Sequence, residues 1–204
     1  MDLDRERSRR EEYSEATRLA LLLAAKTLFA SQGYQATGIE AVAQAARVTR
    51  GALYHHFDDK KALFDAVVVD LQANAARVIA ERARAEPDKW QRLRVGTDAF
   101  LEVCLDPAYR WLVIQEGPAI LGRKRYQEID EAYPLGLMTA TLMSLRRAGE
   151  LTFDDPDLLS RMISAMICEV AQLLADSETP EALKPRVQEA LDRILAAFRR
   201  PGPP

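Results

Sequence analysis

The chain contains 204 residues, of which 48% are hydrophobic and 29% are charged, and its formal net charge is −3 at pH 7. These proportions are typical of a globular protein and exclude an intrinsically disordered chain. The slightly negative charge argues against a protein that coats nucleic acid indiscriminately, because such binding depends on phosphate neutralisation by Lys and Arg, but it allows a small basic face.

Residues 1–13 form a charged arm, in which Arg5, Arg7, Arg9 and Arg10 are nearly balanced by acidic residues. A basic arm can enter the minor groove of DNA, but this charge balance favours a disordered or frayed charged helix. The arm is also unlike a signal peptide, and no stretch approaches the roughly 18 uninterrupted apolar residues of a membrane span. We therefore expect a cytoplasmic protein that does not contact a membrane.

A helix-turn-helix unit is predicted next, within a domain of residues 14–62. Apolar residues recur every three or four positions from Thr17 to Gln32, which predicts a helix that ends at Gly33. Two short helices should follow over about residues 38–57, joined by a tight turn at Arg47 and Val48. They are Gly38–Ala45, with Thr37 as its N-cap, and Arg50–His56, with Thr49 as its N-cap.

Helices also account for the remaining body, residues 63–200, before a short tail at 201–204. The predicted helices run from Asp58–Lys60 to Ala85, over Asp88–Leu105, Pro107–Gln115 and Pro118–Ala148 with a bend near Pro134, and over Pro156–Ala175 and Pro180–Arg199. Cys104 and Cys168 stand among apolar residues of these helices without the CxxC spacing of zinc or redox sites, so we interpret them as buried thiols. The fold class is therefore all-α.

A distributed motif with fixed spacing covers Thr17 to Phe64, about a quarter of the chain. Its members are Arg18, Ala24, Ala25, Leu28, Phe29, Gly33, Tyr34, Thr37, Ile39, Val42, Ala43, Ala46, Val48, Thr49, Gly51, Leu53, Tyr54, His56, Phe57, Lys60, Leu63 and Phe64. This pattern resembles the TetR family of bacterial regulators. The resemblance implies an N-terminal three-helix helix-turn-helix DNA-binding domain followed by a helical ligand-binding and dimerisation domain. It also implies a homodimeric repressor that binds palindromic double-stranded operator DNA and is released by a small-molecule effector.

The second helix of the motif should present its outer face to DNA, because Leu53 and Phe57 form its inner face. Its N-terminal residues would then lie at the bases, with Arg50 able to bind guanine O6 and N7. The predicted DNA contacts are Thr37, Thr49, Arg50, Gly51, Tyr54, His55, His56 and Lys60, of which Thr37, His56 and Lys60 are assigned by resemblance as phosphate contacts.

Alternatives remain for several of these contacts. Tyr54 and His55 could be ordinary surface residues, and Lys60 could be a solvated charge at a helix start. His56 could equally be buried beside Phe57 and hydrogen-bonded to the backbone.

Two positions depart from the family pattern. Arg47 stands where glycine is usual in the turn, and a left-handed arginine there would cost about 1 kcal/mol or more. Gly38 stands where a hydroxyl residue is common. Arg47 therefore implies either a slightly altered turn or a strained one that is tolerated for an additional phosphate contact.

Enzyme and metal signals fail on inspection. Gly117 to Lys124 superficially resembles the phosphate loop G-x-x-x-x-G-K-[ST], but Arg123 and Lys124 replace the lysine and the hydroxyl residue, and no strand precedes it. The only two histidines are adjacent, so they lack the i,i+4 pairing of helical zinc sites. We predict no metal, no cofactor and no catalytic residue.

Wide apolar stripes on the last two predicted helices suggest a four-helix dimer interface, with an intramolecular core as the alternative. The predicted interface residues are Ile163, Ile167, Val170, Leu174, Val187, Leu191 and Ile194. Aromatic, thioether and isolated polar side chains in the middle helices suggest an effector pocket, although core packing explains them equally well. The predicted pocket residues are Phe100, Cys104, Trp111, Gln115 and Met138.

Overall fold

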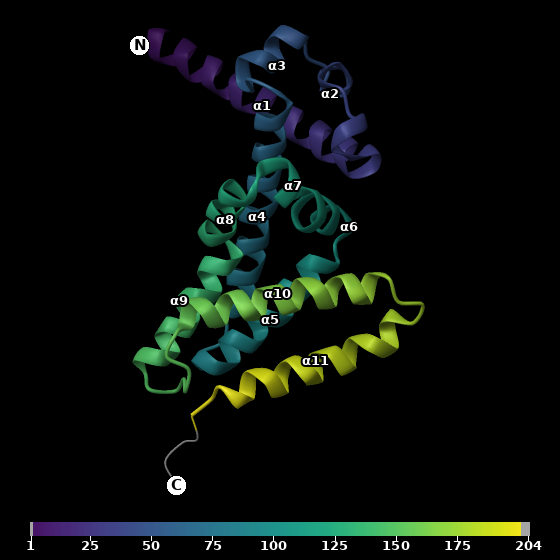
Figure 1. The fold of residues 1–204 in the computed structure, drawn as a ribbon. Helices are drawn as coiled ribbons and strands as arrows, with labels where there is room; N and C mark the ends of the chain where they lie inside the picture. The colour runs from purple at the N-terminus through teal and green to yellow at the C-terminus, as the bar shows by residue number, and fades with distance from the viewer. Residues whose placement is uncertain (1, 201–204) are drawn as a thin grey trace.

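The computed structural model describes residues 2–200, with side chains described from residue 12 onward, and Figure 1 shows this part of the chain as helices joined by short links. The elements are α1 (Asp2–Ala36), α2 (Ile39–Ala45), α3 (Arg50–His56), α4 (Lys60–Arg84), α5 (Lys89–Leu105), α6 (Pro107–Tyr109), the π-helix η1 (Arg110–Glu116), α7 (Gly117–Leu121), α8 (Arg123–Ala132), α9 (Pro134–Arg147), α10 (Pro156–Ala175) and α11 (Pro180–Ala197). The predicted all-α fold is confirmed.

A small head is formed by α1, α2 and α3 at one end of the molecule, and α4 runs from this head into the body (Figure 1). Its core contains the fully buried side chains of Leu21, Phe29, Leu53 and Phe64. The Phe29 ring meets Phe64 at a centroid distance of 5.4 Å in an edge-to-face arrangement. The start of α4 is therefore part of the core of the head.

The first helix is longer than its apolar pattern predicts. Its backbone begins at Asp2, so the charged residues expected to be disordered or frayed continue the helix. Gly33, with φ 80° and ψ 160°, interrupts the helical geometry near the end, where the sequence predicts a stop.

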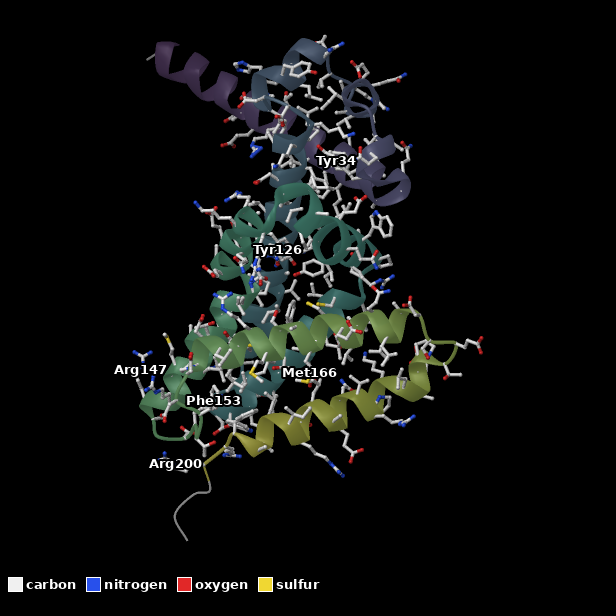
Figure 2. The ribbon with its side chains drawn as sticks, viewed as in Figure 1. Tyr34, Tyr126, Arg147, Phe153, Met166 and Arg200 are labelled. Carbon is white, nitrogen blue, oxygen red and sulfur yellow. The ribbon has the colours of Figure 1, made fainter. Side chains whose placement is uncertain are left out.

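In the body, α4, α5, α9 and α10 pack on one another, and α11 lies along α10 and contacts α5. The C-terminal end of α11 is tied back to the segment after α9, where the Thr152 amide donates to the Phe198 carbonyl at 2.9 Å. Phe153 and Phe198 also stack edge to face, with their ring centroids 5.8 Å apart; Phe153 is labelled in Figure 2.

Two predicted helices are subdivided in the structure. The segment expected over Pro107–Gln115 becomes one turn of α6 followed by the π-helix η1. The segment expected over Pro118–Ala148 is broken at Gly122, which has φ 84°, and again at Tyr133, beside the predicted bend at Pro134. The π-helix and the break at Gly122 were not predicted, whereas the break at Tyr133 lies at the predicted bend.

By length and composition, α10 is also apolar enough to cross a membrane. However, its inner face packs against α5 and α9, as in a core helix, and it carries Asp157, Arg161 and Glu169.

Candidate nucleic-acid interface and ligand cavity

The recognition helix α3 begins with the predicted cap. The hydroxyl oxygen of Thr49 accepts a hydrogen bond from the Ala52 amide at 3.1 Å. Leu53 is fully buried and Phe57 is 5% exposed, so these two side chains fix the inner face of α3 against the head. The rest of the helix is free to face outward.

The outer face of α3 brings together five of the predicted DNA contacts. These exposed residues are Thr49, Arg50, Gly51, Tyr54 and His55. Arg50 Nη1 lies 2.8 Å from Glu40 Oε1 of α2, and the Arg50 guanidinium carbon lies 5.4 Å from the Tyr54 ring centroid. The side chain best suited to bind a base is therefore already held at the surface by two neighbours.

The turn before α3 contains a backbone that favours glycine. Arg47 has φ 57°, in the left-handed region, as its position in the turn predicts. The turn is closed by two hydrogen bonds, from the Arg47 amide to the Gln44 carbonyl at 3.0 Å and from the Val48 amide to the Ala43 carbonyl at 2.9 Å. The arginine at this position therefore leaves the turn intact, and the Arg47 side chain is exposed.

Thr37 does not lie on the exposed surface. Its side chain is 1% exposed, and its hydroxyl donates to the Gly33 carbonyl at 2.8 Å and the Leu28 carbonyl at 3.3 Å. The N-cap of α2 is Gly38, which makes no side-chain cap, so the prediction that Thr37 caps this helix is wrong. The hydroxyl of Thr37 closes the end of α1 instead, and it does not face outward to meet a phosphate.

Lys60 and His56 are half-buried at the edge of the head. Lys60 Nζ donates to the Gln35 carbonyl at 3.2 Å and lies 4.3 Å from the Tyr34 ring centroid, so it ties α4 to the end of α1. The pKa of His56 is lowered by burial and by the positive fields of His55 and Arg18. Lys60 is therefore bound within the head rather than freely solvated, and His56 is only half-buried beside Phe57.

The head is also held to the body by one carboxylate. Glu116, the last residue of η1, accepts the Tyr34 amide through both carboxylate oxygens, each at 3.2 Å. Figure 2 shows Tyr34 where the head meets the body. No sequence pattern indicated this contact, because its two residues are 82 positions apart in the chain.

A cavity of about 310 Å³ opens in the body between the end of α4, the first half of α5 and α9. Its lining residues are Ile79, Ala80, Ala83, Arg84, Arg92, Leu93, Gly96, Thr97, Phe100, Pro134, Leu137, Met138 and Thr141. Phe100 and Met138 were predicted as pocket residues and do lie here. The small lining residues Ala80, Ala83 and Gly96 and the two arginines were not predicted.

The other three predicted pocket residues lie outside this cavity. Cys104 is fully buried as a free thiol, while Trp111 is 43% exposed. Gln115 donates to Gln172 at 2.7 Å on an exposed part of the body. These three predictions are wrong for the cavity that the structure contains.

A separate buried polar cluster lies between α4, α6 and α8. The Tyr109 hydroxyl donates to Gln72 Oε1 at 2.7 Å, and Gln72 Nε2 donates to Asp130 Oδ1 at 3.4 Å. Burial raises the pKa of Asp130, because removing a carboxylate from water disfavours its charged form. These residues satisfy one another's hydrogen bonds, and none of them lines the cavity.

Most of the predicted interface residues face inward. Ile163, Ile167, Leu174, Val187 and Leu191 are buried in the core of the chain itself, so their side chains are closed to a partner and the intramolecular alternative holds for them. Val170 is half-buried, and Ile194 is 40% exposed.

The exposed apolar surface lies on the flank of the same two helices. On α10, Leu158, Met162 and Leu173 are 47%, 54% and 55% exposed, and Ile194 of α11 is the exposed member of the predicted set. We call these four residues the apolar flank. The apolar stripes predicted on these two helices are wide, so the sequence alone does not distinguish the buried centre of each stripe from its exposed flank. That distinction requires the rotation of each helix about its own axis.

A head with a capped recognition helix, an outward basic and aromatic face and a long helix leading to a separate body defines a helix-turn-helix DNA-binding regulator of transcription. Two family models match the chain: the tetR family of bacterial regulatory proteins over residues 21–67 and the tetracyclin repressor-like C-terminal domain over residues 90–198. The chain therefore belongs to the TetR family of transcriptional regulators.

Individual relatives agree along most of the chain. The Transposon Tn10 TetC protein of Escherichia coli is 27% identical over 165 residues, which cover 81% of this chain and 83% of that protein. The HTH-type transcriptional repressor Rv1474c of Mycobacterium tuberculosis is 26% identical over 93% of this chain and 97% of its own length. The crystal structure of a TetR-family regulator from Pectobacterium atrosepticum superposes with a TM-score of 0.73 at 29% identity, covering 94% of this chain and 98% of that one.

Proposed function

We propose that this regulator is a repressor that binds a palindromic operator as a homodimer and releases it when a small molecule enters the body. The exposed face of α3, with Arg50 at its N-terminal end, is the observation that supports operator binding. Arginine at this position of a recognition helix can bind guanine through two hydrogen bonds. A cytoplasmic location follows from this function.

The proposed partner of one chain is a second copy of it. The apolar flank consists of large side chains that the chain itself leaves exposed, and they run along two neighbouring helices. Two such pairs related by a twofold axis would form a four-helix interface in which each copy covers the flank of the other. This interface would place two α3 helices on one operator.

The proposed switch runs along α4. Its first turns belong to the core of the head through Leu63 and Phe64, and its last turns line the cavity through Ile79, Ala80 and Ala83. A ligand that moves the end of α4 would therefore change the separation of the two heads. Recognition helices must lie about 34–36 Å apart to occupy successive major grooves, so a small pivot would weaken binding.

The direct experiment is a band shift of the full chain with the DNA upstream of its own gene, at increasing salt concentration. We expect a specific complex that weakens with salt, because Lys and Arg contacts release counterions from the phosphates. An Arg50→Ala variant should lose the specific complex first. Failure to bind any upstream fragment at low salt would contradict the proposal.

A second candidate is a helical ligand-binding or scaffolding protein that has lost DNA binding. The observation that favours it is the strained Arg47 in the turn, together with the pairing of Arg50 with Glu40. The same band shift separates the two candidates, since a protein that has lost DNA binding would shift neither the upstream fragment nor a scrambled one.

A further inference from the structure

We propose that the cavity selects organic anions that have an apolar body and one carboxylate-like group, which binds beside Arg84 and Arg92. This inference rests on the proposed function, because it names the chemical class of the effector. Arg84 and Arg92 are the charged residues of the lining, and the lining contains no acidic side chain.

Arg92 is held in place by the turn between α4 and α5. Its Nε and Nη2 groups donate to the Glu86 carbonyl at 3.1 and 2.7 Å, and the side chain is half-buried. Nη1 is not used in these bonds, so it still has N–H groups to donate. A guanidinium fixed in this way loses little further freedom when it binds a carboxylate.

Arg84 adds a second positive charge at the last turn of α4. Its side chain is exposed, and within residues 12–200 no acidic side chain forms an ion pair with Arg84 or Arg92. Of the nearby acids, Glu81 pairs with Arg77, Asp88 caps α5, and Glu86 contributes its backbone carbonyl to Arg92. The mouth of the cavity therefore carries positive charge that a ligand can neutralise.

The other polar groups of the lining cannot replace the arginines as donors. The Thr97 hydroxyl donates to the Leu93 carbonyl at 2.9 Å, and the Thr141 hydroxyl donates to the Leu137 carbonyl at 3.0 Å. With their protons engaged in their own helices, both oxygens can only accept. The two arginines therefore supply the donors of the lining, and a carboxylate is an acceptor that suits a guanidinium.

The rest of the lining is apolar and adaptable. Leu93, Phe100 and Met138 are buried around it, and Met138 can change rotamer to follow the shape of a ligand. Gly96 also faces this space, and a Cβ there would approach only Ile79 Cγ2, at 3.8 Å. Its missing side chain thus contributes to the depth of the cavity.

Three probes with the same alkyl chain test the inference: decanoate, decanol and decylammonium, each titrated into the full-length wild type by calorimetry. We expect decanoate to bind at least tenfold more tightly than decanol, and decylammonium to bind most weakly. The double variant Arg84→Gln/Arg92→Gln should lose the preference for decanoate but keep its affinity for decanol. The single variant Arg84→Gln should lose part of the preference for decanoate. It keeps the test valid if the loss of Arg92 disturbs the turn between α4 and α5.

Two matched controls separate the site from general charge and from folding. Arg123→Gln, on the exposed surface of α8 and outside the cavity lining, removes the same single charge as Arg84→Gln and should leave all three affinities unchanged. Gly96→Leu should block all three probes, whereas Gly96→Ala, which fits the available space, should still bind decanoate. Equal affinity of decanoate and decanol for the wild type, or an unchanged preference in the double variant, would overturn the inference.

Operator binding measured with the same probes separates this inference from the proposed function. Decanoate that binds as expected but leaves operator affinity unchanged would contradict the effector role and leave the anion site standing. Release of the operator by decanol as readily as by decanoate would contradict anion selection and leave the effector role standing.

Discussion

Arg50 has two neighbours in the DNA-free head, the Glu40 carboxylate and the Tyr54 ring. The pair with Glu40 is exposed on both sides, so it is worth at most about 1 kcal/mol and can yield to a guanine base. Arg50→Ala should weaken operator binding by about 1–3 kcal/mol and relax the preference at one base pair in each half-site. Titrations on operator variants measure both effects.

Glu40→Gln is the matched variant for this prediction. It frees Arg50 without removing it, so operator binding should tighten by less than about 1 kcal/mol. A loss from Arg50→Ala that is uniform over all DNA sequences would reassign Arg50 to a phosphate contact.

Arg47 occupies a left-handed backbone conformation with φ 57°. Arg47→Gly should therefore raise the free energy of unfolding by up to about 1 kcal/mol, since glycine adopts this conformation without strain but loses more entropy on folding. Arg47→Ala keeps the Cβ and should show no such gain. Urea denaturation at a fixed protein concentration compares the three chains, and equal stabilisation by Gly and Ala would show that backbone strain is not the cause.

His56 has a pKa below its ordinary value in the folded chain. As the pH falls through the ordinary histidine pKa of about 6.5, the unfolded chain takes up this proton first, so the stability of the fold should decrease. His56→Gln should remove that part of the pH dependence, and Gln44→Ala, an exposed change in the head that removes no titratable group, serves as the control. Thermal unfolding between mildly acidic and neutral pH measures the difference; identical pH profiles for His56→Gln and wild type would contradict it.

At the scale of elements, the apolar flank of α10 and α11 determines which substitutions test dimerisation. Met162→Glu with Leu173→Glu should lower the mass in solution from twice the chain mass of 22.9 kDa toward that of one chain. Leu23→Glu places the same charge on an exposed leucine of α1 and should leave the dimer intact. Light scattering reports the mass, and a monomeric wild type at micromolar concentration would contradict the interface.

Substitutions at the buried centre of the apolar stripe would report on folding rather than on dimerisation. Ile167 is fully buried in the core of its own chain, so a charge there would leave an unpaired ion in an apolar site and unfold the body. The flank residues avoid this ambiguity because they are exposed.

The sequence predicts helices best where local signals mark their ends. α3 and α10 have the predicted bounds, because Thr49 caps one and Asp155 caps the other directly before Pro156. The break at Tyr133 agrees with the bend predicted near Pro134, whereas the π-helix η1 and the break at Gly122 were not predicted, since a π-helix depends on tertiary packing.

The candidate sites divide in the same way. The outer face of α3 follows from the spacing within one helix, and the structure places its residues together. The cavity needs the relative rotations of α4, α5 and α9, which periodicity along one helix does not contain. For this reason Gly96, Arg84 and Arg92 were missed, and Cys104, Trp111 and Gln115 were assigned wrongly.

At the scale of the whole molecule, the head and the body meet at Glu116 as well as through α4. Because both carboxylate oxygens accept the Tyr34 amide, Glu116→Ala should leave this amide without its partner and speed its hydrogen exchange. Glu128→Ala on exposed α8 is the control, and its Tyr34 exchange should match the wild type. An unchanged Tyr34 exchange rate in Glu116→Ala would show that the contact does not hold the head.

The apolar flank also links the response of the target gene to the amount of protein in the cell. If only the pair of chains binds the operator, the concentration of the active species rises with the square of the monomer concentration wherever the pair dissociates. Halving the gene dose would then lower the active concentration fourfold rather than twofold. Tighter association through the flank would remove this threshold, so in the proposed dimer the exposed side chains of α10 would set how sharply the target gene responds as the protein accumulates.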